Sequence, residues 1–129
     1  NFAFGSPTSE VERVNEVLWK ATEAGIKAAV PGATTLDIFN TMNKIIEEGG
    51  ALGNNVGRLG HGLGLQLTEP PSHRLEEATV IKENMVLTIE PGMEYEKDKM
   101  LVHEENIVIH KDGAELITKR APREIPIIK

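Results

Sequence analysis

Cysteine is absent from the 129 residues of this sequence. Its absence removes disulfide bonds and thiolate zinc sites together, so a metal ion could be held only by carboxylate and imidazole groups. The sequence also lacks an apolar run long enough for a transmembrane helix. It does not open with the basic and apolar segments of a signal peptide. We therefore expect no membrane association and a cytoplasmic location.

Basic residues are fewer than acidic residues in this sequence. The chain has 14 Lys and Arg against 20 Asp and Glu, which gives a net charge of -6. Phosphate binding requires a basic patch, so we expect no nucleic-acid partner. Hydrophobic residues make up 40% of the chain and charged residues 26%, as in ordinary globular proteins, and the length allows one domain with a modest core.

The first half of the chain has the spacing of two helices. Apolar residues recur at helical intervals from residue 11 to about residue 29. Ser6 and Pro7 predict the start of this helix, as the N-cap and the first helical residue. Pro31-Gly32 predicts its end.

A second helix is predicted after this turn. Thr34 and Asp37 resemble a capping box, with Asp where Glu is usual. One apolar stripe follows and stops before Gly49-Gly50; it consists of Ile38, Phe39, Met42, Ile45 and Ile46. We therefore expect a helical hairpin over about residues 7–49.

The second half is expected to be rich in β-structure over about residues 55–120. Strand-like segments cover residues 85–90, 101–110 and 115–118, and residues 1–4 and 120–129 also have an extended pattern. Asp112-Gly113 is a turn signal that favours antiparallel pairing of the strands on either side. Two helices followed by mostly antiparallel strands predict an α+β fold.

Three positions could carry chemistry, and the first is His61. It lies between Gly60 and Gly62, where the backbone must bend sharply or come close to another group. The glycine neighbours leave the imidazole open to a metal ion. A histidine that is merely tolerated in a glycine-rich turn is the commoner case, so the ligand interpretation needs support from elsewhere.

The second position is Glu90, at the end of a predicted strand. Alternation along the strand places Thr88 and Glu90 on one face, and Leu87 and Ile89 on the other. Pro91 stops the ladder beyond it. A carboxylate at a strand end is well placed for a site, but a solvated glutamate at the edge of a sheet explains the same pattern.

The third position lies where polar residues interrupt the strand at 101–110. A period of two places Glu104 and Asn106 on one face, and His103 and Glu105 on the other. Buried unpaired charges are costly, so either this strand lies at an exposed edge or one face meets a metal ion. One histidine and two glutamates would suit Mn, Mg, Co or Zn in a paired-metal hydrolase, although the sequence offers no convincing aspartate partner.

Three stretches of the sequence stand out: GHGLGLQLTEPPS at residues 60–72, ENMVLTIEPGM at 83–93 and HEENIVI at 103–109. They resemble the pita-bread superfamily of methionine aminopeptidase, prolidase and creatinase. The turn between the predicted helices, VPGATTLDIF, resembles the same family. The resemblance covers nearly the whole chain. It implies a partial pita-bread fold, with two helices packed on a mostly antiparallel curved sheet.

The resemblance implies a hydrolase of amide or peptide bonds that uses two divalent metal ions, Mn, Co or Zn. The family's ligands are Asp, Asp, His, Glu and Glu. By residue match His61 is the histidine ligand, Glu90 the glutamate of the TIEPG strand and Glu104 the bridging glutamate. Glu104 is preferred to Glu105 because the family's ligand lies five positions before the apolar end of this strand, here Ile109. His61 and Glu90 are also the expected catalytic residues.

The two aspartate ligands of the family should precede a stretch like NFAFG, with which this chain begins. We therefore expect residues 1–129 to form an incomplete C-terminal catalytic domain, with little activity and weak metal binding of its own. The parent enzyme is expected to act on a small peptide or amide and to form a homodimer.

Thr68 stands where the family's proline peptidases carry a histidine near the substrate. This departure weakens the assignment as an Xaa-Pro dipeptidase or aminopeptidase, and leaves open a creatinase-like or ectoine-hydrolase-like enzyme that opens small amides. Arg58 could contact a substrate carboxylate or be a surface residue. A non-catalytic binding module is a further alternative, although it would have no need of His61, Glu90 and Glu104 together.

Overall fold

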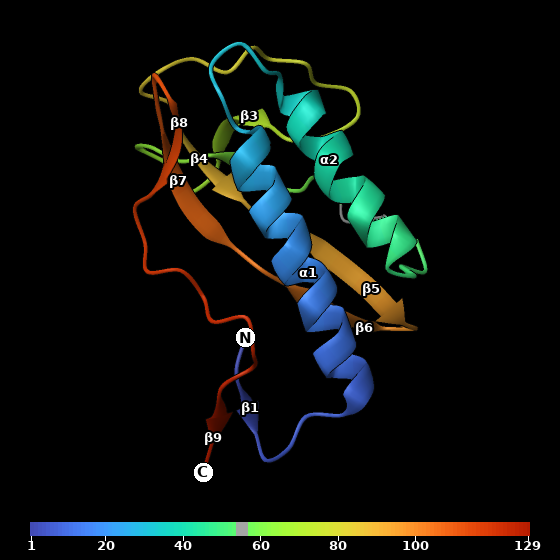
Figure 1. Cartoon of the computed structure of the whole chain (residues 1–129). Helices are drawn as coiled ribbons and strands as arrows, with labels where there is room; N and C mark the ends of the chain where they lie inside the picture. Colours follow the sequence, from blue (N-terminus) through green and yellow to red (C-terminus); the bar gives the residue numbers. More distant parts are fainter. Residues whose placement is uncertain (54–56) are drawn as a thin grey trace.

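Two helices lie side by side on one face of an antiparallel sheet in the computed structural model, which describes residues 1–53 and 57–129 (Figure 1). The helices are α1, Ser9–Ala28, and α2, Thr35–Glu48. Residue 55, the expected start of the sheet-rich part, lies outside the described residues. Neither helix combines the length and the apolar character that crossing a bilayer requires.

Helix α1 begins later than the sequence predicts. Its N-cap is Thr8, which has an extended backbone and whose Oγ1 accepts a hydrogen bond from the N–H of Val11 at 3.3 Å. The prediction of Ser6 as the N-cap and Pro7 as the first helical residue is therefore wrong, because a second capping residue follows them. Two glutamates in the first turn favour this start through the helix dipole.

Helix α2 begins with the capping box that the sequence predicts. The Oγ1 of Thr34 accepts from the N–H of Asp37 at 3.1 Å, and the Oδ2 of Asp37 accepts from the N–H of Thr34 at 2.8 Å. Aspartate in place of glutamate therefore still satisfies both backbone donors at this helix end.

The larger sheet has five strands in the order β3-β2-β4-β7-β8, and every neighbouring pair is antiparallel. The strands are β2, His61–Gly62; β3, Glu69–Ser72; β4, Val86–Ile89; β7, Glu105–His110; and β8, Gly113–Leu116. Two helices with a mostly antiparallel sheet confirm the α+β prediction. Strand β8 begins two residues earlier than the predicted segment at 115–118, because the turn that precedes it closes at Gly113.

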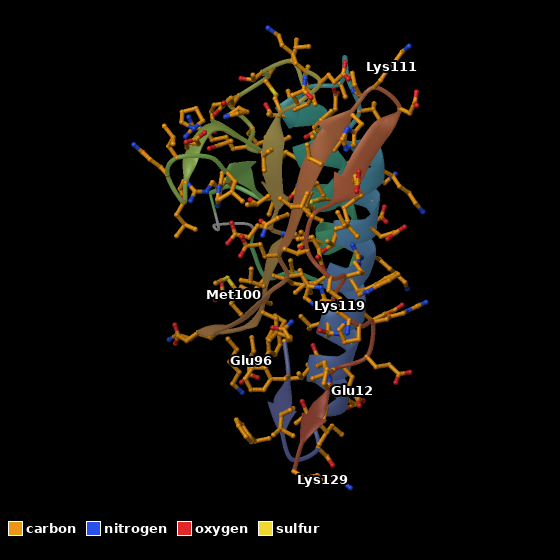
Figure 2. All side chains as sticks on the ribbon, turned by 90° about the vertical axis from the view of Figure 1, so that its left-hand side faces the viewer. Glu12, Glu96, Met100, Lys111, Lys119 and Lys129 are labelled. Atoms are coloured by element: carbon orange, nitrogen blue, oxygen red, sulfur yellow. The ribbon has the colours of Figure 1, made fainter. Side chains whose placement is uncertain are left out.

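Two smaller pairs complete the β-structure. Strands β5, Gly92–Glu96, and β6, Lys99–Val102, form an antiparallel hairpin. This hairpin projects away from the helices, with Glu96 and Met100 on it (Figure 2). Strands β1, Ala3–Phe4, and β9, Ile127–Ile128, pair in parallel and hold the two ends of the chain together (Figure 1).

The core lies between the helices and one face of the larger sheet. The central strands β4 and β7 contribute four fully buried side chains to it: Leu87, Ile89, Ile107 and Ile109. Each such side chain stabilises the fold by about 1.5–3 kcal/mol. Helix α1 approaches this face closely at Gly25, where a Cβ atom would lie 2.9 Å from Ile89 Cγ2. Thr88 and Asn106 alternate with the core residues and therefore belong to the opposite face.

Candidate metal centre

Backbone hydrogen bonds around the end of β4 bring His61 and Glu90 together. The N–H of Glu90 donates to the carbonyl oxygen of Leu59 at 2.9 Å, and the N–H of His61 donates to Thr88 Oγ1 at 3.0 Å. The side chains meet: His61 Nε2 lies 3.4 Å from Glu90 Oε2. Two of the three ligand positions expected from the sequence are therefore in contact.

The surroundings of His61 indicate which ring nitrogen carries the proton. Its Nδ1 lies 2.8 Å from the carbonyl oxygen of Gly62 and therefore donates to it. Nε2 then directs a lone pair towards Glu90, whose oxygens are also electron-rich. Two such groups repel each other unless a proton or a cation lies between them. A neutral imidazole with its Nδ1–H bound to a carbonyl is the form in which histidine binds metals.

The strand register places Glu104 opposite Glu90. The pairs on either side of this position are Ile89–Glu105, Pro91–His103 and Gly92–Val102, the middle one joined by an N–H···O bond of 3.0 Å. Residues directly opposite each other in an antiparallel pair have Cβ atoms roughly 5 Å apart and share a face. Glu104 is exposed, and this register assigns it to the same face of the sheet as Glu90.

Glu105 belongs to the other face of the same strand. Only 3% of it is exposed; its Oε1 accepts from the N–H of Ala121 at 2.8 Å and its Oε2 from the hydroxyl of Thr118 at 3.3 Å. The sequence left open whether the polar residues here mark an exposed edge or a metal site. Glu105 marks neither an exposed edge nor a metal site, because its hydrogen-bond partners belong to the C-terminal tail.

Two glycines around His61 allow close backbone approach. A Cβ atom at Gly60 would lie 2.2 Å from the carbonyl oxygen of Thr88, and one at Gly62 would lie 2.5 Å from the carbonyl oxygen of Pro70. Gly60 also has a φ of +142°, a backbone conformation that side chains disfavour. The close approach that the sequence predicts in this stretch is therefore present at both glycines.

A cavity of about 400 Å³ opens beside Glu90. Its polar lining comes from Glu90, Arg58, Ser72 and Arg74, and Met100 and Val102 form its apolar wall. The structure thus brings Arg58, a candidate from the sequence, to the same cavity as Glu90. Thr68 is exposed in the loop before β3 and is not part of the lining.

Two buried histidines escaped the sequence-based search for site residues. His73 is fully buried, and its Nε2 lies 3.1 Å from the carbonyl oxygen of Thr88. His103 is 6% exposed, and its Nε2 lies 2.8 Å from Asn15 Oδ1. Burial lowers the pKa of each histidine to about 4, so both imidazoles are neutral at pH 7. No local motif marks them, because only long-range contacts reveal their burial.

The donor atoms at this site suit a divalent cation, but they do not enclose one. Nitrogen from His61 and oxygen from Glu90 and Glu104 are ligands that Mn, Co and Zn accept. Across residues 1–53 and 57–129, no group of three or more His, Cys, Asp or Glu side chains is arranged to hold a metal ion. The structure therefore brings two metal-capable side chains, His61 and Glu90, into contact without enclosing a metal ion in the part of the chain that it describes.

Comparison with known proteins reveals close relatives. The Xaa-Pro dipeptidase of Pyrococcus furiosus is 35% identical over 115 residues, which are 89% of this chain and 33% of that protein. The putative dipeptidase YkvY of Bacillus subtilis is 34% identical over 127 residues, covering 98% of this chain and 35% of that protein. The chain thus spans about a third of the length of these relatives.

Solved structures show the same fold. The crystal structure of X-Pro aminopeptidase from Thermotoga maritima superimposes with a TM-score of 0.86 and 31% identity, over 98% of this chain and 36% of that one. The two helices and antiparallel sheet are therefore part of the pita-bread fold. A family model for metallopeptidase family M24 matches residues 1–112, and the chain belongs to this family.

Proposed function

We propose that this chain carries part of the active site of a dinuclear metal-dependent hydrolase that cleaves Xaa-Pro dipeptides. The contact between His61 and Glu90 at the end of β4 carries the proposal. The names of the relatives, Xaa-Pro dipeptidase and X-Pro aminopeptidase, support the reaction. The share of their length that the chain spans supports the assignment of residues 1–129 to one part of a longer catalytic domain.

In this proposal His61, Glu90 and Glu104 hold two divalent cations, Mn, Co or Zn. When bound, such cations lower the pKa of a water molecule and polarise the carbonyl group of the substrate. His61 contributes Nε2, because its Nδ1 is engaged with Gly62. Glu104 would contribute a carboxylate from the position opposite Glu90. Glu90 accepts the proton of the attacking water and passes it to the leaving amine.

The cavity beside Glu90 suits a substrate with a free carboxylate. Arg58 and Arg74 both line it, and Arg74 Nε is engaged with Glu77 Oε2 at 3.4 Å. The terminal nitrogens of Arg74 are the donors that bind carboxylates in a bidentate manner. Met100 and Val102 offer an apolar wall for a proline ring. We therefore propose a dipeptide as substrate, with its carboxylate bound by Arg58 and Arg74 and with Thr68, outside the cavity lining, as a further contact from the loop before β3.

A creatinase-like or ectoine-hydrolase-like enzyme is the second candidate, and Thr68 favours it. A threonine cannot take part in proton transfer as a histidine can, so the cleavage of small amides remains compatible with this site. Activity that survives exhaustive chelation would favour this candidate. The close contact of His61 with Glu90 argues against a third candidate, a non-catalytic binding module.

The decisive experiment measures metal binding and Xaa-Pro hydrolysis in the longest natural chain that contains these residues. Glu90→Gln should abolish stoichiometric Mn²⁺ or Co²⁺ binding in calorimetry, and should reduce kcat for Xaa-Pro dipeptides at least about a thousandfold. Glu83→Gln, at an exposed position, is the matched control and should leave both unchanged. An unaltered metal stoichiometry in the Glu90 variant would contradict the proposal.

The isolated chain is expected to behave differently from the longer enzyme. With three ligand side chains and no enclosed group among the residues that the structure describes, it should bind Co²⁺ weakly and show no measurable dipeptidase activity. We also propose a cytoplasmic homodimer as the state of the whole enzyme. Sedimentation of the longer chain at several concentrations tests the dimer.

A further inference from the structure

His73 occupies an unusual place for a polar residue. It is fully buried, and its Nε2 donates to the carbonyl oxygen of Thr88 at 3.1 Å. Its Nδ1 is also buried and has no hydrogen-bond partner among the residues that the structure describes. An apolar side chain would avoid this unpaired acceptor. The single hydrogen bond from Nε2 is therefore the feature that distinguishes His73 from an ordinary core residue.

That hydrogen bond ends on a residue that already supports the candidate metal centre. The Oγ1 of Thr88 accepts from the N–H of His61 at 3.0 Å, while the carbonyl oxygen of Thr88 accepts from His73. Thr88 is also two residues before Glu90 on the same face of β4. One threonine thus joins His73 to the backbone of His61 and, two residues along the chain, to Glu90.

The backbone of His73 also forms hydrogen bonds with the segment that precedes His61. Its N–H donates to the carbonyl oxygen of Gly60 at 3.0 Å, and its carbonyl oxygen accepts from the N–H of Leu59 at 2.8 Å. Leu59 in turn accepts from the N–H of Glu90. The imidazole packs tightly here, since a Cβ atom at Gly60 would lie 2.5 Å from His73 Cδ2. His73 is therefore packed directly against the segment that carries His61.

We infer that His73 is a positioning residue for the metal centre, which holds Thr88 and thereby fixes His61 and Glu90 relative to each other. The inference rests on the proposed metal-binding role of His61 and Glu90. His73 itself is not among the residues that line the cavity beside Glu90. Its contribution is to order two ligands before a cation arrives, which raises affinity because less freedom is lost on binding.

Amide hydrogen exchange tests the positioning role without metal. In His73→Leu, the amides of His61 and Glu90 should exchange about tenfold faster, whereas that of Leu18 in α1 should be unchanged. His73→Gln retains a side-chain N–H donor and should restore slow exchange. His110→Leu, at an exposed histidine, is the matched control and should exchange as the unmodified chain does. Equal acceleration at Leu18, or none at His61 and Glu90, would overturn the inference.

Cobalt binding provides the second readout and separates the inference from the proposed function. If the site binds Co²⁺, His73→Leu should weaken its affinity about tenfold and His73→Gln should recover most of it. If the longest natural chain that contains these residues binds no Co²⁺, the proposed function fails, while the exchange rates still decide the role of His73.

The unmodified protein also tests the inference, in case the leucine variant does not fold. Nitrogen NMR of the imidazole should show His73 protonated at Nε2, with a ring proton protected from solvent. A ring protonated at Nδ1 could not donate to Thr88 and would overturn the inference.

Discussion

At the scale of single residues, Glu104 and Glu105 are chain neighbours with opposite surroundings. Glu104 is exposed on the face shared with Glu90, whereas Glu105 accepts hydrogen bonds from Ala121 and Thr118 in the buried part of the protein. Glu104 is therefore expected to contribute little to stability and Glu105 much, and mutation of each residue can separate these two roles.

Glu105→Ala should destabilise the chain by about 3 kcal/mol, because it leaves the donors of Ala121 and Thr118 without their acceptor and removes a carboxylate 4.0 Å from Arg120 Nε. Glu104→Ala should change the free energy of unfolding by less than about 0.5 kcal/mol, as at other exposed positions. Urea denaturation of both variants measures the difference. Similar losses in the two variants would show that this strand does not have the alternation described above.

Gly60 provides a second test at the residue scale. Gly60→Ala should destabilise the chain by roughly 3 kcal/mol or more, because the new Cβ would overlap the carbonyl oxygen of Thr88 and because φ is positive. Gly5→Ala is the control: Gly5 also has a positive φ, but none of the described residues has an atom within 4 Å of an added Cβ. The Gly5→Ala substitution should lower the free energy of unfolding by only about 1 kcal/mol. Thermal unfolding of the two variants checks the comparison.

At the scale of secondary-structure elements, the start of α1 can be tested directly. Thr8→Ala removes the N-cap acceptor and should lower stability by about 1 kcal/mol. Ser6→Ala, at the position that the sequence alone favours, should have almost no effect. Urea melts of the two variants distinguish the two starts, and a larger loss in the Ser6 variant would contradict the observed cap.

Sequence patterns predict which helices and strands are present better than they predict the residues at which these elements begin and end. The capping box at Thr34 and Asp37 could be found because both partners are three residues apart in the chain. The strand predicted at 101–110 is divided into β6 and β7, with residues 103 and 104 between them. Hydrophobic periodicity does not reveal this break, because the residues on both sides of it keep the same alternation and the same cross-strand pairing.

At the scale of the whole molecule, buried histidine should make stability depend on pH. Burial holds the pKa of His73 at about 4, below the 6.5 of an exposed histidine. Between these values the unfolded chain binds a proton that the folded chain does not, so stability is complete above pH 6.5 and falls as the pH drops towards 4.

The loss from His73 should reach about 3 kcal/mol at pH 4. His73→Gln should remove this contribution, while that of His103 remains in both proteins. Urea melts between pH 7 and pH 4.5 provide the measurement, with the variant showing the shallower decline. Parallel pH profiles for the two proteins would contradict the burial of His73 as a neutral group.

The candidate site was predictable from sequence only in part. His61, Glu90 and Glu104 could be selected from short motifs that resemble the pita-bread family. His73 and Arg74 could not, because their roles depend on a loop that folds back beside β4 and on the cavity there. Long-range contacts of this kind leave no periodic trace in the sequence.

The unbroken pairing from β4 into β5 has a consequence for folding errors. If β7 slipped by one residue against β4, Glu105 would replace Glu104 opposite Glu90, and a carboxylate would still stand at the site. Charge alone therefore does not distinguish the correct alignment from the slipped one. The discrimination comes from Ile107 and Ile109, which the slip would expel into solvent while drawing Asn106 and Val108 towards the helices.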